Sequence, residues 1–142
     1  MLSNSEVAKR FSEGETRGQS LHMFIDGDTI YSYGYHFPIA RMTELQDTEG
    51  RNIVLFTNKC YSNTTARHKS YVHRYLSSAY YRVIEVNDVK QGLTQDLLDQ
   101  IYLKIIDYIL KAKRARKEYI KQAWESQVRS LQSDYKLVNS LI

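Results

Sequence analysis

A chain of 142 residues with 42% hydrophobic content can bury one modest core, which excludes two ordinary domains but leaves room for a helical appendage. Its formal net charge of +4 favours anionic partners, and its single cysteine excludes an internal disulfide. No apolar run approaches the roughly 20 residues that a membrane span requires, and the first residues lack the basic and apolar regions of a signal peptide. We therefore expect a cytoplasmic protein without a membrane partner.

The first half of the chain predicts a short helix followed by a β-meander. Residues 3–6 resemble a helix cap, and the apolar residues that follow have helical spacing, so we expect a helix that ends near Gly14. Asp26-Gly27-Asp28 then separates two alternating runs, and Asp-Gly is a strong hairpin signal because the turn needs positive φ. Residues 37–42 and 53–56 predict two further strands, with a turn at Glu49-Gly50 between them.

From Ser62 the pattern becomes helical. A helix over residues 64–78 would place His68 and Val72 on an apolar face and Arg67 and Arg74 on the opposite, basic face. Residues 80–86 are β-branched and aromatic enough for another strand. The predicted fold class is therefore α+β, with a small antiparallel β-sheet covered by a helix over residues 1–90.

Residues 91–142 predict a C-terminal helical segment, because no Gly or Pro follows Gly92 and Thr94 can cap a helix. Its first apolar stripe consists of Leu97, Leu98, Ile101, Ile105 and Ile109. Its second apolar stripe has the alternating spacing of a coiled-coil seam, although the stripe is short enough for an ordinary packed helix to explain it. The sequence leaves open whether the segment is one long helix or a helical pair, and whether it forms a homodimer. The stripe contains Trp124, Val128, Leu131, Tyr135, Val138 and Ile142.

The region between Gly50 and Ile84 carries the clearest functional signal, because it has no acidic residue and interleaves basic with aromatic side chains. Lys and Arg release counterions from phosphates, and aromatic faces stack on bases. Free N–H groups and hydroxyls at the start of the predicted helix would also suit a phosphate. The alternative is that the hydroxyls only cap the helix and the cations only face solvent. The candidate anion-binding residues are Lys59, Ser62, Thr64, Thr65, Arg67, Lys69 and Arg74.

A second basic run lies between the two apolar stripes of the C-terminal segment, and its neighbouring acids are too few to neutralise it. It adds Lys111, Lys113, Arg114, Arg116 and Lys117 to the candidate nucleic-acid contacts. Aromatic and large apolar residues dominate interface hot spots, so a protein partner would be anchored elsewhere on this segment. The candidate anchors are Tyr119, Trp124, Leu131 and Tyr135.

Catalytic and metal-binding patterns are weak. His68 and His73 are five residues apart, which on a helix separates their directions, and Cys60 at the end of a strand is typical of a small packed residue. A metal-dependent nuclease would need carboxylates such as Asp28 and Glu85 to cluster. We therefore expect a protein that is not an enzyme and uses no metal or cofactor, with a metal-dependent nuclease as the alternative.

Three motifs carry a resemblance. Asp26-Gly27-Asp28-Thr29-Ile30-Tyr31-Ser32-Tyr33 is followed by Pro38-Ile39-Ala40 and then by Lys59-Cys60-Tyr61-Ser62-Asn63-Thr64-Thr65-Ala66-Arg67-His68. This order resembles a family of small, uncharacterised proteins of bacteriophages and mobile elements, although Cys60 and the inserted Tyr35-His36 depart from its pattern. The resemblance implies no established activity, but small basic phage proteins often bind nucleic acid or inhibit a host defence nuclease such as a CRISPR effector.

Two functional hypotheses follow. In the first, a non-enzymatic phage-type protein in the host cytoplasm uses its basic, tyrosine-rich face to engage nucleic acid or the nucleic-acid channel of a nucleoprotein, a host defence complex included. In the alternative, an inhibitor of a host defence nuclease, similar to an anti-CRISPR protein, acts through direct protein contacts. Its C-terminal helices then serve for docking or dimerisation.

Overall fold

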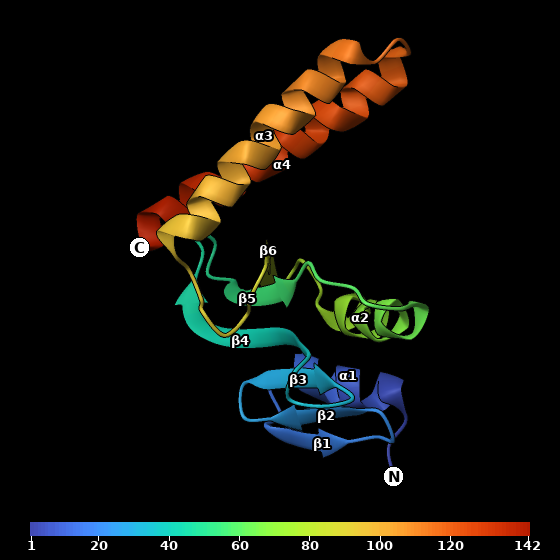
Figure 1. The fold of residues 1–142 in the computed structure, drawn as a ribbon. Helices are drawn as coiled ribbons and strands as arrows, with labels where there is room; N and C mark the ends of the chain where they lie inside the picture. The colour runs from blue at the N-terminus through green and yellow to red at the C-terminus, as the bar shows by residue number, and fades with distance from the viewer. The chain divides into compact units, whose positions relative to one another are not determined.

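The computed structural model describes residues 1–142, which form two compact units, Met1–Gly92 and Leu93–Ile142 (Figure 1). The first unit combines a sheet with two helices, and the second consists of two helices. This content confirms the predicted α+β class.

The first unit is built on a six-stranded sheet whose strands lie in sequence order. Neighbouring strands from the first to the fifth are antiparallel, as predicted, whereas the last two are parallel, with Asn52 opposite Tyr81. The parallel pair arises because a helix carries the chain back between these strands. The strands are β1 (Arg17–Gln19), β2 (Met23–Asp26), β3 (Thr29–Ser32), β4 (Pro38–Gln46), β5 (Asn52–Thr57) and β6 (Tyr81–Val86).

Strand β1 was not expected, because Arg17-Gly18-Gln19 lacks β-branched and aromatic residues. It exists as an edge strand because its backbone pairs with β2, where Arg17 lies opposite Asp26. The predicted hairpin between β2 and β3 is present, and Gly27 has the positive φ of 65° that its turn requires.

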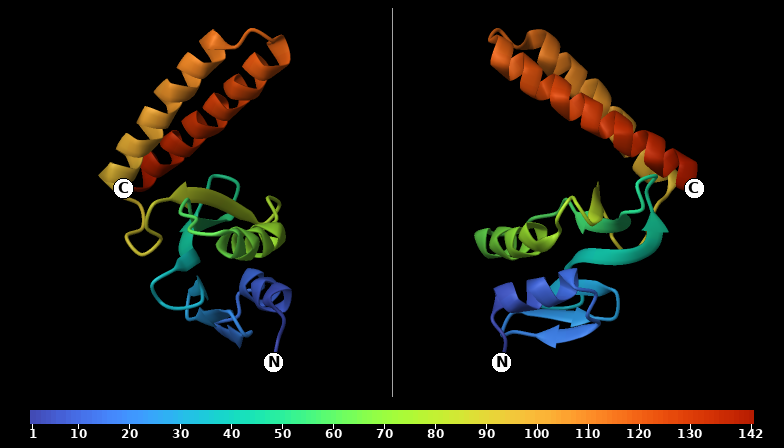
Figure 2. Two further views of the ribbon diagram at one scale, coloured as in Figure 1. Left: turned by 45° about the vertical axis from the view of Figure 1, so that its right-hand side comes forward. Right: turned by 180° about the vertical axis from the view of Figure 1, so that it is seen from behind.

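Two helices complete this unit (Figure 2). Helix α1 (Asn4–Ser12) begins with a capping box formed by Ser3 and Glu6, and α2 (Asn63–Tyr75) forms the crossover between β5 and β6. Their apolar faces share one core with the sheet, since both helices contribute fully buried side chains to it. This core contains Val7, Ala8, Phe11, Met23, Ile25, Ile30, Phe37, Ile39, Ala40, Val54, Phe56, Val72 and Leu76.

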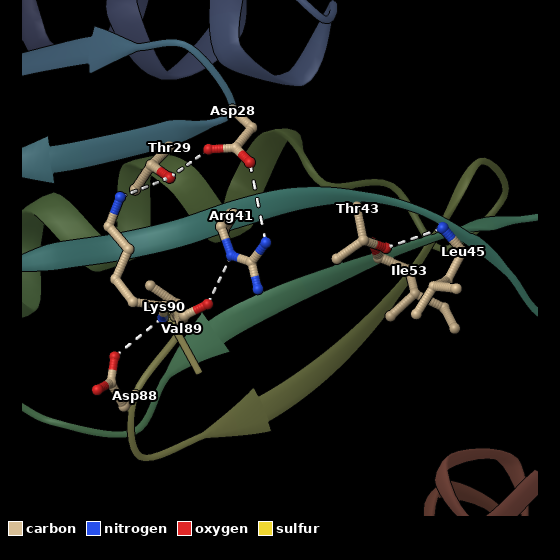
Figure 3. A network of polar contacts seen from close by, with 9 residues as sticks. All are labelled: Asp28, Thr29, Arg41, Thr43, Leu45, Ile53, Asp88, Val89 and Lys90. Carbon is tan, nitrogen blue, oxygen red and sulfur yellow. Dashed lines mark hydrogen bonds and ion pairs between the residues drawn. The ribbon is translucent and has the colours of Figure 1, made fainter. Parts of the chain in front are cut away.

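The segment that follows β6 is held against β3 and β4 by a polar network (Figure 3). The Nε atom of Arg41 donates to the carbonyl of Val89 at 2.6 Å, and a second guanidinium nitrogen of Arg41 lies 3.8 Å from an oxygen of Asp28. The ammonium group of Lys90 lies over the ring of Tyr31, 4.9 Å from its centre, and 3.4 Å from the hydroxyl of Thr29. These contacts hold Val89 fully buried.

The second unit is an antiparallel pair of helices, α3 (Gln95–Arg114) and α4 (Glu118–Leu141), which lie side by side in Figures 1 and 2. Thr94 caps α3 as predicted, because its hydroxyl accepts a hydrogen bond from the backbone N–H of Leu97 at 3.1 Å. The chain turns at Ala115, whose backbone is extended. The C-terminal segment is therefore two helices and not one long helix. Neither helix, nor any other in the chain, combines the length and apolar character needed to span a membrane.

Candidate functional site

The residues of the predicted basic region lie in the loop between β5 and α2 and on α2 itself. Ser62 is the N-cap of α2, and its Oγ atom accepts from the backbone N–H of Thr65 at 3.1 Å and lies 3.1 Å from the Thr65 hydroxyl. Thr65 is buried, and Thr64 is half-buried. The hydroxyls of Ser62 and Thr65 are therefore engaged in the helix cap, which matches the structural alternative for these two residues.

Four cations of this region have no carboxylate within ion-pair distance. They are Lys59 in the loop and Arg67, Lys69 and Arg74 on α2. Arg51, which belongs to the same acid-free stretch of sequence, instead pairs with Asp47 at 2.8 Å. The positive charge that the sequence indicated thus survives folding on α2 and its preceding loop.

A shallow groove of about 550 Å³ runs beside α2 and has an aromatic floor. Phe56 lines it, and the Phe56 and His73 rings meet edge-on with their centres 5.5 Å apart. The ammonium group of Lys69 lies 5.6 Å from the Phe56 ring centre. That ammonium group also donates to the carbonyl of Lys59 at 3.0 Å, which fixes its position. The lining consists of Phe56, Cys60, Ala66, Lys69, Ser70, His73 and Arg74.

A smaller pocket of about 250 Å³ also borders the β5–α2 loop. Lys59 and Tyr61 line it together with Phe37, whose ring meets that of Tyr61 edge-on at 5.0 Å. Asp88 and Lys90, which Figure 3 labels, also line this pocket. The side chain of Tyr61 is 70% exposed, so an aromatic face is available beside the four cations that lack carboxylate partners.

The second basic run lies where the two helices of the hairpin meet. Lys113 and Arg114 end α3, and Arg116 and Lys117 belong to the link to α4. All four are exposed. The negative end of the α3 dipole favours Lys113 and Arg114, whereas Arg116 and Lys117 lie at the positive end of the α4 dipole, which does not favour cations. Lys111 differs, because it pairs with Asp107 at 3.1 Å and its ammonium group lies over the Trp124 ring at 4.9 Å.

Three of the four candidate anchors for a protein partner are engaged within the helical hairpin. The Trp124 ring contacts Tyr108 of α3 at 4.9 Å, and the Tyr135 ring lies 6.5 Å from that of Tyr102. Leu131, which lies between Trp124 and Tyr135 in the sequence, is half-buried. Tyr119 is the exception, since 67% of its surface is exposed. The seam that suggested a dimer on α4 thus packs against α3 of the same chain.

A buried polar network around His68 was not anticipated from the sequence. The Nδ1 atom of His68 lies 2.6 Å from the hydroxyl of Ser32, and its Nε2 atom lies 3.4 Å from the amide nitrogen of Asn4. The amide orientation of Asn4 is set by Ser20, whose hydroxyl donates to the Asn4 carbonyl oxygen at 2.5 Å. Because the Asn4 nitrogen can only donate, Nε2 of His68 accepts and Nδ1–H donates to Ser32.

This arrangement joins the residue types of a serine–histidine–asparagine triad, but the protons run in the wrong direction for one. His68 donates to the Ser32 hydroxyl instead of accepting its proton, and both side chains are almost wholly buried, at 1% exposure each. Burial lowers the pKa of His68, and electrostatic interactions with His22 and Arg67 lower it further. The network therefore holds a neutral imidazole that ties α1 and α2 to β3.

The carboxylates considered for a metal site do not converge. Asp28 accepts from the Thr29 hydroxyl and faces Arg41, while Asp26 accepts from the hydroxyl of Tyr35 at 2.8 Å. No group of three or more His, Cys, Asp and Glu side chains has the geometry to hold a metal ion. Cys60 is exposed, and its thiol lies 3.4 Å from the carbonyl of Ser62.

Comparisons with protein-family models, with characterised proteins and with solved structures gave no match to this chain. The resemblance to small phage proteins consequently stays a hypothesis.

Proposed function

We propose that the first unit binds single-stranded nucleic acid along the outer face of α2. The observation that carries this proposal is the group of four cations without carboxylate partners on and beside α2, next to a groove with an aromatic floor. A phosphate backbone would replace water around these cations and release condensed counterions, which is the main source of non-specific affinity.

The positions of the cations suit a strand that follows the helix. Arg67 and Arg74 are seven residues apart, so they project from one side of α2 at a separation of about 10 Å along its axis. Lys69 lies on the groove side, above Phe56. Two phosphates spaced along a flexible single strand can reach both arginines without distortion, whereas the rigid spacing of a duplex restricts that choice.

Exposed tyrosines at both ends of α2 favour single strands over duplexes. Tyr61 precedes the helix and is 70% exposed, and Tyr80 follows it and is 74% exposed. Unpaired bases can stack on such rings for about 1–3 kcal/mol each, while bases inside a duplex are already stacked. The exposed cations where α3 meets α4 are proposed as a second, purely electrostatic contact.

The test is fluorescence anisotropy with labelled single-stranded DNA, single-stranded RNA and duplex DNA, titrated at several salt concentrations. Four phosphate contacts predict that the logarithm of the association constant falls with the logarithm of the salt concentration at a slope of about −2.8 for a single strand. Arg67→Glu combined with Arg74→Glu should abolish binding, because two contacts are lost and two repulsions are introduced. Tyr61→Ala should weaken binding to single strands only.

The matched control is Arg17→Glu combined with Lys136→Glu, which changes the net charge equally at exposed positions outside α2 and its preceding loop. This control should retain most of the affinity and the slope. The single cysteine adds a local readout, because Cys60 is exposed and lines the groove, so a bound strand should slow its alkylation. Equal losses in the two double variants, or unchanged affinity in the α2 variant, would refute the site. No change in anisotropy with any of the three ligands would refute binding of free nucleic acid and favour a host protein as the partner.

A further inference from the structure

Helix α3 carries a further apolar stripe that α4 leaves largely exposed. Its five members occur at positions spaced three, four and seven residues apart, which places them on one side of the helix. They are Tyr102, Leu103, Ile106, Ile109 and Leu110, with exposures of 55%, 64%, 40%, 36% and 42%. Single exposed apolar residues are ordinary, whereas a contiguous row of five marks an interaction surface.

The middle of the stripe, at Ile106, points away from the partner helix of the hairpin, whereas Tyr102 lies at the edge of the stripe, with its ring centre 6.5 Å from that of Tyr135. Tyr108 contacts Trp124 of α4, and Ala112 is buried one turn later. Ile106 precedes Tyr108 by two residues, which rotates its side chain about 200° around the helix axis. Helix α3 is thus apolar on two sides, while pairing with one neighbour requires only one.

The charges at the two ends of the stripe are opposite and symmetric. Asp99 lies seven residues before Ile106 and Lys113 lies seven residues after it, so all three share one side of the helix. Asp99 accepts a hydrogen bond from the neutral amide of Gln95, and no carboxylate lies within ion-pair distance of Lys113. Both charges are therefore available to a partner.

This pattern is complementary to itself in one orientation only. If the α3 helices of two molecules pack antiparallel about Ile106, Asp99 of one copy comes within one helical turn of Lys113 of the other, and this happens twice. A parallel arrangement would instead oppose Asp99 to Asp99 and Lys113 to Lys113. Two-fold symmetric contacts of this kind bury the same patch on both subunits.

We propose that the chain forms a homodimer through antiparallel packing of α3 against α3 of a second copy. The apolar stripe is the centre of the interface, and two Asp99 to Lys113 ion pairs set its orientation. The seam on α4 from Trp124 to Val138 stays within each hairpin. This inference does not depend on the nucleic-acid proposal, because none of its apolar residues lies in the first unit.

The first experiment is sedimentation equilibrium of the full chain over a range of concentrations. The wild type should have twice the 16.7 kDa mass of one chain. Ile106→Ser should weaken the dimer on the order of a hundredfold, because one buried contact is lost from each copy. Tyr119→Ser is the control, since it removes a large exposed side chain outside the stripe and should leave the mass unchanged. A monomeric wild type, or an Ile106→Ser variant that stays dimeric, would overturn the proposal.

The second experiment tests the orientation by charge reversal. Asp99→Lys and Lys113→Asp should each weaken dimerisation on the order of tenfold, because each creates two like-charge contacts across the interface. The double variant should regain the wild-type affinity, since opposite charges face each other again. Arg114→Asp, one residue further along and on another side of α3, is the control for Lys113→Asp. Failure of the double variant to recover would refute antiparallel packing, and circular dichroism of every variant verifies that the hairpin is intact.

Discussion

The buried hydrogen bond between His68 and Ser32 predicts a large effect from the loss of one oxygen atom. In Ser32→Ala, the Nδ1–H group of His68 loses its acceptor while the imidazole remains 1% exposed, so water cannot replace the hydroxyl. An unsatisfied buried donor costs about 1–3 kcal/mol, and little cavity forms because only the hydroxyl is removed. For a unit of the size of Met1–Gly92, a loss of about 2 kcal/mol lowers the melting temperature by about 8–16 °C.

The chain offers separate reporters for its two units. All four histidines lie in the first unit and the single tryptophan, Trp124, lies in α4. Histidine ring signals in NMR spectra recorded during thermal or urea unfolding therefore follow Met1–Gly92, while tryptophan fluorescence follows the hairpin. The histidine signals of Ser32→Ala should report unfolding at the lower temperature worked out above.

Ser70→Ala provides the matched control, because Ser70 is an exposed serine on α2 whose hydroxyl bonds only the Ala66 carbonyl of its own helix. This control should change the free energy of unfolding by less than about 0.5 kcal/mol. If Ser32→Ala lowered the free energy of unfolding as little as Ser70→Ala, the buried hydrogen bond between Ser32 and His68 would not stabilise the fold, and the reasoning would be refuted.

Two further predictions concern His68 and Lys111. The pKa of His68 is lowered in the folded state, so its contribution to stability is complete above the unfolded value of about 6.5 and is lost as the pH falls through the lower folded value. Urea unfolding at about pH 7.5 and about pH 5.5 should show this loss in the wild type and in His73→Asn, and a His68→Asn variant with the same pH dependence would contradict it. Lys111→Ala should destabilise the hairpin by about 1 kcal/mol, measured by tryptophan fluorescence, because it removes the cation above Trp124. Arg116→Ala should not, and equal effects would count against that contact.

Most individual elements were predictable because local patterns specify them. Asp26-Gly27-Asp28 predicts the β2–β3 hairpin through the positive φ that glycine adopts at little cost, and Thr94 predicts the start of α3 through its cap. The apolar positions of α2 follow helical periodicity, so the burial of His68 and Val72 could be expected. Residues close together in the sequence determine whether each of these elements is a helix, a strand or a turn.

The site was only partly predictable. The absence of acids near α2 indicated the free cations, but the groove floor requires Phe56 of β5 to lie beside His73 of α2. The His68 network joins residues 36 and 64 positions apart, and no short-range pattern signals such contacts. Arg51 shows the same limit, since its pairing with Asp47 removed it from the basic surface.

By itself, the sequence determined most of the helices and strands, the positive charge of α2 and the division into a mixed unit and a helical segment, because these depend on periodicity, caps and composition over a few turns. Only the tertiary structure decided that β6 pairs parallel to β5, that β1 joins the edge of the sheet and that the α4 seam packs on α3. These outcomes depend on which distant surfaces bury each other. The local patterns are compatible with several such pairings, and the free energy of the whole fold selects one of them.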